Sequence, residues 1–256
     1  MTGLATRTAQ LQQIMGMPIS VHLRGAGMPA DREAAIDAVF AELHEVDRLF
    51  STYDPDSEVR RLDRGELTLA ECDPAVAEVL ALADEARRRT GGYFDVRFPG
   101  PTGVRRLDPS GLVKGWAAER AARHLARVAR DDHYLNAGGD IAMHSAGPAP
   151  WRVGIENPDS PRTVLGVVEL RSGGIATSGT AHRDTHLVDP TTGLRATALR
   201  SVTVSGPSLL WADVYATAAF ARGADALDWL AELDGYEGLV VTRTGAVLTT
   251  AGLRLR

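Results

Sequence analysis

The pattern of apolar residues changes near Asp131 and divides the chain into a helical part and a strand-rich part. Before Asp131, apolar residues recur every three or four positions, as on amphipathic helices, over 29–53, 74–90 and 113–129. After Asp131, short runs of β-branched residues alternate with glycine turns, which is typical of strands. Helices that gather in one part of a chain and strands in another favour the α+β class, here as one compact domain of helices packed on antiparallel sheets.

Local signals place the ends of several elements. Asp31 is placed to cap the first helix, and Asp73 with Pro74 is a typical helix start. An alanine-rich helix is expected over 209–222, ending at Gly223, and another over 225–233. The expected strands are 134–143, 151–155, 164–170, 186–188, 200–205, 239–242 and 246–250.

Composition excludes several classes of protein. The chain has 256 residues and a formal net charge of -5, which argues against a nucleic-acid partner held by bulk electrostatics. Its single cysteine, Cys72, excludes an internal disulfide and a thiolate zinc cluster. We expect residues 1–12 to form a flexible N-terminus and 13–256 to form the domain. The sequence shows neither a signal peptide nor a lipid-bearing cysteine nor an apolar span, so we expect a cytoplasmic protein without membrane insertion.

Two residues on the alanine-rich helix could bind a metal ion. Asp213 and Thr217 are four residues apart, so their side chains lie one turn apart on the same face. A carboxylate and a hydroxyl are hard oxygen ligands of the kind that Mg²⁺ binds. The structural alternative is that Asp213 stabilises the helix dipole and Thr217 packs among alanines.

Glycine-containing segments are the other candidates for ligand contact. Glycine makes up 26 of 256 residues, and the excess gathers in short clusters where backbone can approach a ligand closely. Asp108 to Gly115 could bind phosphate through its helix-start amides and Lys114, or could simply be a helix-entry turn. Ser172 to Gly179, with Arg183 and His186 beyond it, could form a ligand site, although turn and strand roles explain these residues too. The segment 136–140 could be a tight turn.

The order of these segments resembles the ApbE family, the FAD:protein FMN transferases. The matching pieces are Met15-Gly16, 50–53 with 56–58 and 61–62, 90–95, 108–115, 136–140, 176–179, Arg183, 186–193, 212–213 and 216–217. They are collinear over about nine-tenths of the chain, and they imply a modified T-fold that binds FAD with Mg²⁺ at the pyrophosphate. The flavin-nucleotide positions are Met15, Tyr53, Tyr93, Phe94, Asp95, Asp108, Lys114 and Leu187, and the metal positions are Gly111, Asp213 and Thr217.

The resemblance implies transfer of FMN from FAD to a Thr or Ser hydroxyl of an acceptor protein, with release of AMP. We expect His186 to be the catalytic base, although Asp213 could also orient the hydroxyl. The short segment between Asp95 and Asp108 departs from the family and resembles an actinobacterial-type branch. The residues Met17 and Asp63 also depart from the family pattern. These departures and the short segment leave two alternatives open. One is an FAD storage or delivery protein without turnover, and the other is an FAD pyrophosphatase giving FMN and AMP.

Overall fold

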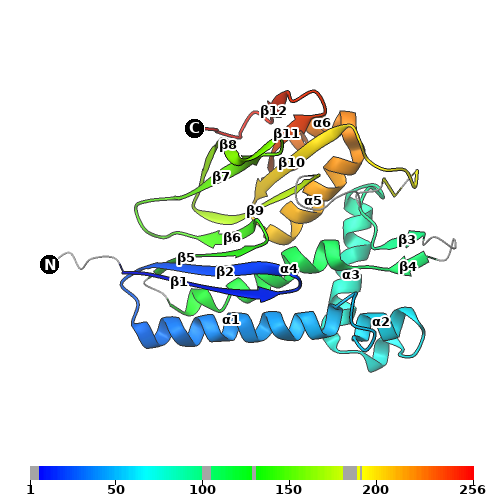
Figure 1. Cartoon of the computed structure of the whole chain (residues 1–256), viewed down its shortest axis with the longest axis horizontal. Helices are drawn as coiled ribbons and strands as arrows, with labels where there is room; N and C mark the ends of the chain where they lie inside the picture. The colour runs from blue at the N-terminus through cyan, green and yellow to red at the C-terminus, as the bar shows by residue number, and fades with distance from the viewer. Residues whose placement is uncertain (1–5, 100–104, 129–130, 181–188, 191) are drawn as a thin grey trace.

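The protein is built on an antiparallel sheet whose strand order differs from its order in sequence. The computed structural model describes residues 6–99, 105–128, 131–180, 189–190 and 192–256. Within them, an eight-stranded sheet has the order β1-β2-β5-β6-β9-β10-β11-β12 (Figure 1). Its strands are β1 (Thr6–Ile14), β2 (Met17–Gly25), β5 (Asp131–Ala137), β6 (Asp140–His144), β9 (Ser172–Gly179), β10 (Leu199–Gly206), β11 (Glu237–Thr242) and β12 (Val247–Thr249).

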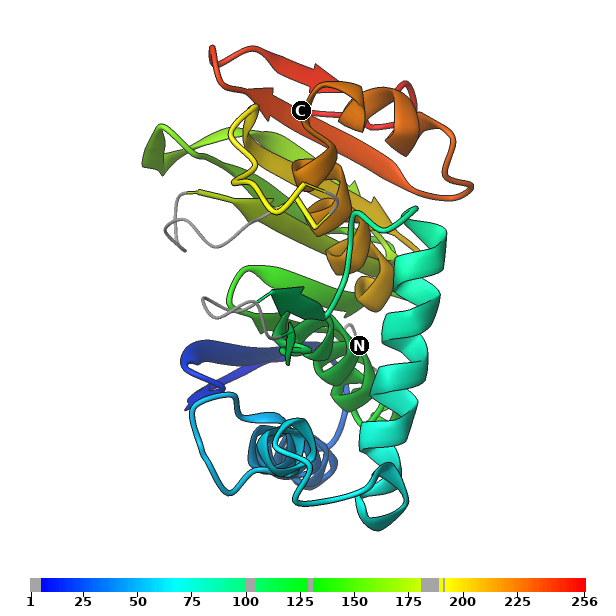
Figure 2. The same ribbon diagram turned by 90° about the vertical axis from the view of Figure 1, so that its right-hand side faces the viewer.

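One face of this sheet is covered by helices that follow the strand order. α1 packs on β1, α4 on β5 and β6, α5 on β9 and β10, and α6 on β11 (Figure 2). The helices are α1 (Pro29–Phe50), α2 (Glu58–Asp63), α3 (Pro74–Arg89), α4 (Ser110–Ala122), α5 (Leu209–Arg222) and α6 (Ala226–Ala231), with 3-10 turns at Leu69–Glu71, Leu125–Arg127 and Gly223–Asp225. The main core lies between these helices and the sheet, and this arrangement confirms the α+β class.

The opposite face is covered in part by a hairpin that lies between β6 and β9 in the sequence. β7 (Trp151–Asn157) and β8 (Ser160–Leu170) pair with each other and leave the main sheet. Ile155 and Val168 from this hairpin form a second core with Leu239 and Val241 of β11. A short pair, β3 (Arg97–Pro99) and β4 (Arg105–Leu107), completes the strands of the described residues.

A buried ion pair ties α1 to β5. Arg32 Nη2 donates to Asp131 Oδ1 at 2.9 Å, and Arg32 Nε contacts Asp131 Oδ2 at 2.5 Å. The amide of Gly27 also donates to Asp131 Oδ1 at 2.8 Å. Arg32 Nη1 donates to the Thr8 hydroxyl, and Nη2 donates also to the carbonyl of Thr6. The hydrogen bonds of both buried groups are therefore satisfied by described residues, which is what a structural ion pair requires.

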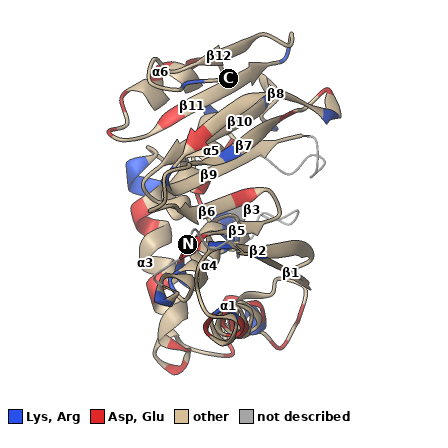
Figure 3. Ribbon diagram, turned by 90° about the vertical axis from the view of Figure 1, so that its left-hand side faces the viewer, with Lys and Arg blue, Asp and Glu red and all other residues tan. Residues whose placement is uncertain are grey.

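Two expectations about the ends of helices are confirmed. Asp73 caps α3 by accepting from the amide of Ala75, and α5 spans 209–222 and ends at Gly223, which has a φ of 71°. Both signs of charge occur along α1 and α3 (Figure 3). No helix in the described part of the chain is both long and apolar enough to cross a bilayer.

Other expectations were wrong. Residues 6–12, expected to be flexible, belong to β1 and pair with β2. Residues 1–5 lie outside the described residues, and so does the strand expected over 186–188. Asp31 lies in the first turn of α1, whose N-cap is Met28. The helix expected over 113–129 begins at Ser110, and its regular part ends at Ala122. The strand expected over 134–143 is interrupted by a turn at Gly138 and Gly139, both with positive φ, and becomes β5 and β6.

The glycine-rich segment 172–179 is the central strand β9, and at least two of its glycines face protein rather than ligand. A Cβ on Gly174 would lie 2.4 Å from Cα of Leu209, and one on Gly173 would lie 2.2 Å from the carbonyl oxygen of Gly206. Glycine is required at both positions because the start of α5 and the end of β10 press against β9. Close packing of protein atoms therefore explains the glycines at positions 173 and 174.

Candidate functional site

The candidate site is built around Lys114, whose ammonium contacts two buried carboxylates. Lys114 is on α4, Asp140 begins β6, and Asp213 is on α5. The ammonium forms ion pairs with Asp140 Oδ2 and with Asp213 Oδ1, the latter at 3.5 Å. Asp140 and Asp213 are only 1% and 2% exposed. These three side chains bring two carboxylates and one ammonium together in a region of low dielectric, where charges interact strongly.

The close approach of α4 and α5 brings Lys114 to Asp213. A Cβ on Gly115 would lie 3.0 Å from Cβ of Asp213 and 3.2 Å from the carbonyl oxygen of Leu209, so glycine at this position lets the helices meet. Glu119 of α4 fixes their register, because its Oε2 accepts from the Ser208 hydroxyl at 2.7 Å and from the amide of Leu210 at 3.0 Å. The start of α5, one turn before Asp213, is thus held by α4.

Hydroxyl and amide groups of β9 lie next to the cluster of Lys114, Asp140 and Asp213. The amide of Thr177 donates to Asp140 Oδ1 at 3.0 Å. The hydroxyls of Ser178 and Thr217 lie 2.9 Å apart. Asp213 and Thr217 are both on α5, one turn apart, as the sequence predicts. Carboxylate and hydroxyl oxygens from three elements therefore line one region of the molecule.

Some of the predicted flavin positions meet at the start of α4. The Phe94 ring packs on Gly111, where a Cβ would be 3.6 Å from Cε2 of Phe94. Asp95 is 9% exposed and accepts from the amide of Arg97, and its Oδ2 is 3.4 Å from Nε of Arg87. Gly111 lies one turn before Gly115 on α4, hence on the face turned toward α5.

Two further predicted positions flank this region. The Tyr93 ring is covered by the guanidinium of Arg222, 4.5 Å from its centroid. Asp108 accepts from the amide of Ser110 at 3.0 Å and so shapes the entry into α4. The segments 90–95 and 108–115, separate in sequence, are therefore adjacent at the amino end of α4.

Met15 and Tyr53 lie near α1. The backbone of Met15 has a φ of 54°, and its amide donates to Asp47 Oδ2 of α1 at 3.2 Å. Tyr53 follows α1 and is 97% exposed, which is unusual for a large aromatic side chain and suits a residue that contacts a ligand. The turn after Met15 reaches the segment 136–140, because a Cβ on Gly138 would be 2.9 Å from the Met17 sulfur. His186 and Leu187 lie outside the described residues.

Comparisons with known proteins match the segments that carry these site residues. A model of the ApbE family matches residues 15–102 and 101–240. The chain belongs to the ApbE family. An FAD:protein FMN transferase of Escherichia coli K12 is 26% identical over 281 residues, covering 86% of this chain and 80% of that protein. A second, from Rhodobacter capsulatus, is 31% identical over 197 residues, covering 72% of this chain and 37% of that protein.

Solved ApbE structures share the fold. The ApbE protein of Thermotoga maritima superposes with a TM-score of 0.83 at 20% identity, covering 96% of this chain and 97% of that chain. The flavin transferase ApbE of Vibrio cholerae gives 0.82 at 23% identity, covering 96% and 98%. The ApbE-matched range includes Lys114, Asp140, Asp213 and Thr217.

The sequence interpretation did not select two members of this ApbE site. Asp140 was read as part of a tight turn, and it does follow the turn at Gly138 and Gly139, but its carboxylate is buried against Lys114. Ser178 belongs to the glycine-rich segment and to the ApbE-matching piece 176–179 but is not among the predicted site residues, yet its hydroxyl bonds to Thr217. An acidic residue directly after a double-glycine turn, at the start of a buried strand, is the signal that could have identified Asp140.

Proposed function

We propose that this ApbE chain is a Mg²⁺-dependent FAD:protein FMN transferase. It would move FMN from FAD to a Thr or Ser hydroxyl of an acceptor protein and release AMP. The observation that carries the proposal is the buried cluster of Lys114, Asp140 and Asp213 beside Thr217, within the range that matches the ApbE family. The names of the relatives from Escherichia coli and Rhodobacter capsulatus support the same activity.

The donor set fits Mg²⁺. Asp213 supplies a carboxylate, Thr217 a hydroxyl and Gly111 a backbone carbonyl, all of them hard oxygen ligands, and Mg²⁺ commonly takes a few such ligands together with substrate phosphates. Among the described residues, no three His, Cys, Asp or Glu side chains gather as a metal group. The proposed set does not need such a group, since Mg²⁺ is commonly bound through one or two carboxylates together with substrate phosphates. When bound, Mg²⁺ would neutralise charge on the pyrophosphate and polarise its phosphorus centres.

The residues of the chain account for the rest of the chemistry. The acceptor hydroxyl oxygen bonds to the FMN-side phosphorus of FAD, the bond from this phosphorus to the bridging oxygen breaks, and AMP leaves with that oxygen. The ammonium of Lys114 would hold pyrophosphate oxygens and stabilise the charge that develops on AMP. Asp213 would orient the acceptor hydroxyl, and His186 would take its proton as the base.

FAD itself would be held by residues that meet around the start of α4 and near α1. We assign Tyr53 to the flavin ring, because its exposed aromatic face is available for stacking. Phe94 would close the apolar side of the site above Gly111. The full proposed set for FAD is Met15, Tyr53, Tyr93, Phe94, Asp95, Asp108, Lys114 and Leu187.

The direct test is intact-mass analysis of a flavin-acceptor domain incubated with FAD, Mg²⁺ and this protein, with AMP measured in the same reaction. We expect one FMN on the acceptor for each AMP released. Asp213→Asn should suppress both products. The matched control is Asp228→Asn, because Asp228 is exposed in the first turn of α6 and its change should leave both products unaltered.

The same assay separates the two alternatives. A storage or delivery protein would bind FAD stoichiometrically and release no AMP. A pyrophosphatase would give FMN and AMP at the same rate with and without the acceptor domain. Either result, with no FMN on the acceptor, would contradict the transferase.

A further inference from the structure

Ser178 contacts the proposed metal site but is not one of its proposed ligands. Its hydroxyl oxygen is 2.9 Å from the hydroxyl oxygen of Thr217, and the residue is buried, with 9% of its surface exposed. Thr217 supplies the hydroxyl of the proposed Mg²⁺ site, so Ser178 touches a ligand of the ion. A residue in this place can control how that ligand is oriented.

The contact between Ser178 and Thr217 is fixed by the packing of α5 along β9. Gly174 meets the start of α5, since a Cβ on Gly174 would lie 2.4 Å from Cα of Leu209. Four residues later on β9, Ser178 meets Thr217, eight residues later on α5. Four residues of strand rise about 13 Å and eight residues of helix about 12 Å, so strand and helix advance together between the two contacts. Asp213 lies midway between them on α5.

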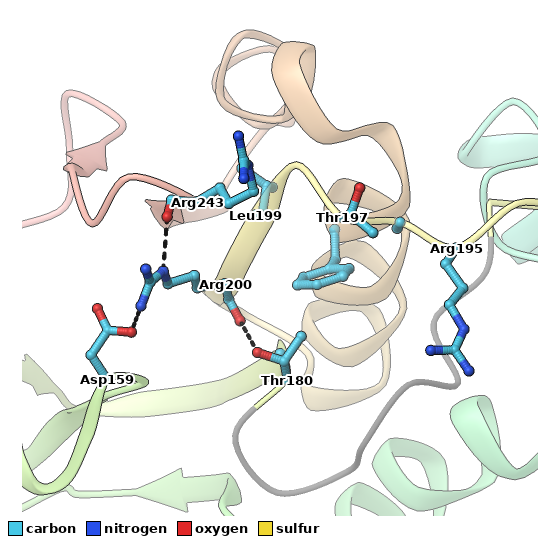
Figure 4. A pocket seen from close by; sticks show the side chains of 10 residues that line it. Asp159, Thr180, Arg195, Thr197, Leu199, Arg200 and Arg243 are labelled. Atoms are coloured by element: carbon cyan, nitrogen blue, oxygen red, sulfur yellow. Dashed lines mark hydrogen bonds and ion pairs between the residues drawn. The ribbon is translucent and has the colours of Figure 1, made fainter.

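Two other hydroxyl groups near the end of β9 bond to residues of β10. Thr177 points to the opposite face of the sheet from Ser178, and its hydroxyl lies 2.8 Å from that of Thr203. Thr180, the residue after β9, lines a pocket and donates its hydroxyl to the carbonyl of Arg200 at 3.5 Å (Figure 4). The hydroxyl of Ser178 instead joins β9 to the helix that carries the proposed metal ligands.

The proton of the Thr217 hydroxyl limits what its oxygen can bind. A hydroxyl has one proton and two lone pairs, and a metal ion takes a lone pair. On a helix, a threonine hydroxyl can turn its proton back to the backbone carbonyl four residues earlier, which for Thr217 is that of Asp213. An oxygen on β9 that accepts this proton holds the hydroxyl in a different orientation and keeps a lone pair available to the ion.

We propose that Ser178 positions Thr217 by accepting its hydroxyl proton, so that the Thr217 oxygen can bind the cation beside Asp213. Ser178 is a positioning residue, because it acts through Thr217 and contacts neither the ion nor FAD. This assignment rests on the proposed transferase function, since Thr217 is a proposed ligand of its Mg²⁺ site.

The test measures Mg²⁺ binding without turnover, by calorimetric titration of Mg²⁺ into the whole protein with FAD present and no acceptor. Ser178→Ala should raise the dissociation constant for Mg²⁺ about fivefold, the effect of one lost hydrogen bond. At limiting Mg²⁺ the rate of FMN transfer should fall by the same factor, and added Mg²⁺ should recover it. Ser178→Thr keeps the hydroxyl and should restore Mg²⁺ binding.

Thr203→Val is the matched control, because it breaks a hydroxyl pair of the same kind on the opposite face of β9. It should lower the melting temperature about as much as Ser178→Ala does and leave Mg²⁺ binding unchanged. The double variant Ser178→Ala/Thr217→Val should bind Mg²⁺ as well as Thr217→Val alone, because Ser178 acts only through Thr217.

Three results would overturn the assignment. The first is wild-type affinity for Mg²⁺ in Ser178→Ala. The second is an equal loss of affinity in Thr203→Val, which would make the effect one of stability. The third is a further loss of affinity when Ser178→Ala is added to Thr217→Val, which would show that Ser178 does not act through Thr217.

Failure of the proposed function would look different. Weaker Mg²⁺ binding in Ser178→Ala that Ser178→Thr restores, together with no FMN on any acceptor, would support the positioning role and contradict the transferase. Mg²⁺-dependent FMN transfer, together with wild-type affinity for Mg²⁺ in Ser178→Ala, would overturn the positioning role and support the transferase.

Discussion

Two buried ion-pair clusters on the same face of the sheet differ in how many carboxylates contact the cation among the described residues. At α1 and β5, one guanidinium meets one carboxylate, and the amide of Gly27 and the hydroxyl of Thr8 complete the hydrogen bonds of Arg32 and Asp131. At α4, β6 and α5, one ammonium, that of Lys114, is shared by Asp140 and Asp213. Both clusters are buried, so burial alone does not distinguish them.

The difference in composition separates a structural pair from the proposed functional site. A buried pair of one guanidinium and one carboxylate holds elements together, and breaking it costs stability because one charge is left without a partner. A lysine that contacts two buried carboxylates beside a hydroxyl has the groups that a site for a cation and an anionic substrate uses. We therefore expect changes at Arg32 to act on folding and changes at Asp213 to act on activity.

The largest expected effect is on catalysis. Asp213→Asn keeps the shape of the side chain but removes a carboxylate from the metal and acceptor positions. We expect the rate of FMN transfer at saturating Mg²⁺ to fall by about a hundredfold to a thousandfold, measured by acceptor mass over time. The melting temperature should change little, because the variant keeps the size of the side chain and Lys114 keeps its ion pair with Asp140. A normal rate together with a large fall in melting temperature would reverse the comparison.

The next effect is on stability. Arg32→Met leaves Asp131 buried without its cation, which should cost about 3–5 kcal/mol of unfolding free energy and lower the melting temperature by about 10 °C. The transfer rate of the folded fraction at low temperature should be unchanged. Arg48→Met is the control on the same helix, because the Arg48–Glu45 pair is exposed and its loss should cost under about 1 kcal/mol. Equal effects of the two changes would contradict a structural role for the buried pair.

A pH-dependent effect is expected on the strand that carries Asp131. Burial, with a smaller effect of His144, lowers the pKa of His133 from 6.5 to about 4. In the unfolded chain His133 binds a proton as the pH falls below 6.5, whereas in the folded chain it binds one only near 4. This contribution to stability is therefore complete above pH 6.5 and is lost as the pH falls toward 4, by about 3 kcal/mol.

His133→Phe should remove that part of the pH dependence, as measured by urea unfolding across this range. The control His44→Gln changes an exposed histidine of α1 and should leave the dependence intact. An unchanged pH profile in His133→Phe would contradict the assignment.

The smallest effect is expected at Thr217. Thr217→Val removes the hydroxyl that bonds to Ser178 and should cost about 1 kcal/mol of stability and about tenfold in transfer rate. Thr217→Ser keeps the hydroxyl and should restore most of both. If the valine and serine variants transfer FMN equally well, the hydroxyl of Thr217 is not part of the reaction centre.

The sequence predicted those features whose cause is local. The cap at Asp73 and the ends of α5 depend on a few neighbouring residues, and both were identified. The spacing of Asp213 and Thr217 follows from helix geometry alone. β1 was missed because its polar, glutamine-rich residues at the sheet edge, most of them exposed, show no alternation of apolar and polar residues.

Features that depend on distant packing could not be predicted. Gly173 and Gly174 suggested a ligand site, but in the fold the segment 206–209 packs closely against them. Asp140 becomes significant only when β6 brings it to Lys114, a residue on α4. The pairing of Arg32 with Asp131, 99 residues apart, gave no local signal. Burial and charge balance are properties of the assembled fold.

The central claim is that the cluster of Lys114, Asp140 and Asp213 beside Thr217 is a metal-assisted transfer centre. The most direct measurement is FMN transfer to the acceptor domain as a function of free Mg²⁺, for the wild type and for Asp213→Asn. We predict a saturable dependence in the wild type that falls to zero after chelation, and a residual rate in the variant that does not respond to Mg²⁺. Full transfer by the chelated wild type, or saturation of the variant at the same Mg²⁺ concentration as the wild type, would contradict the account.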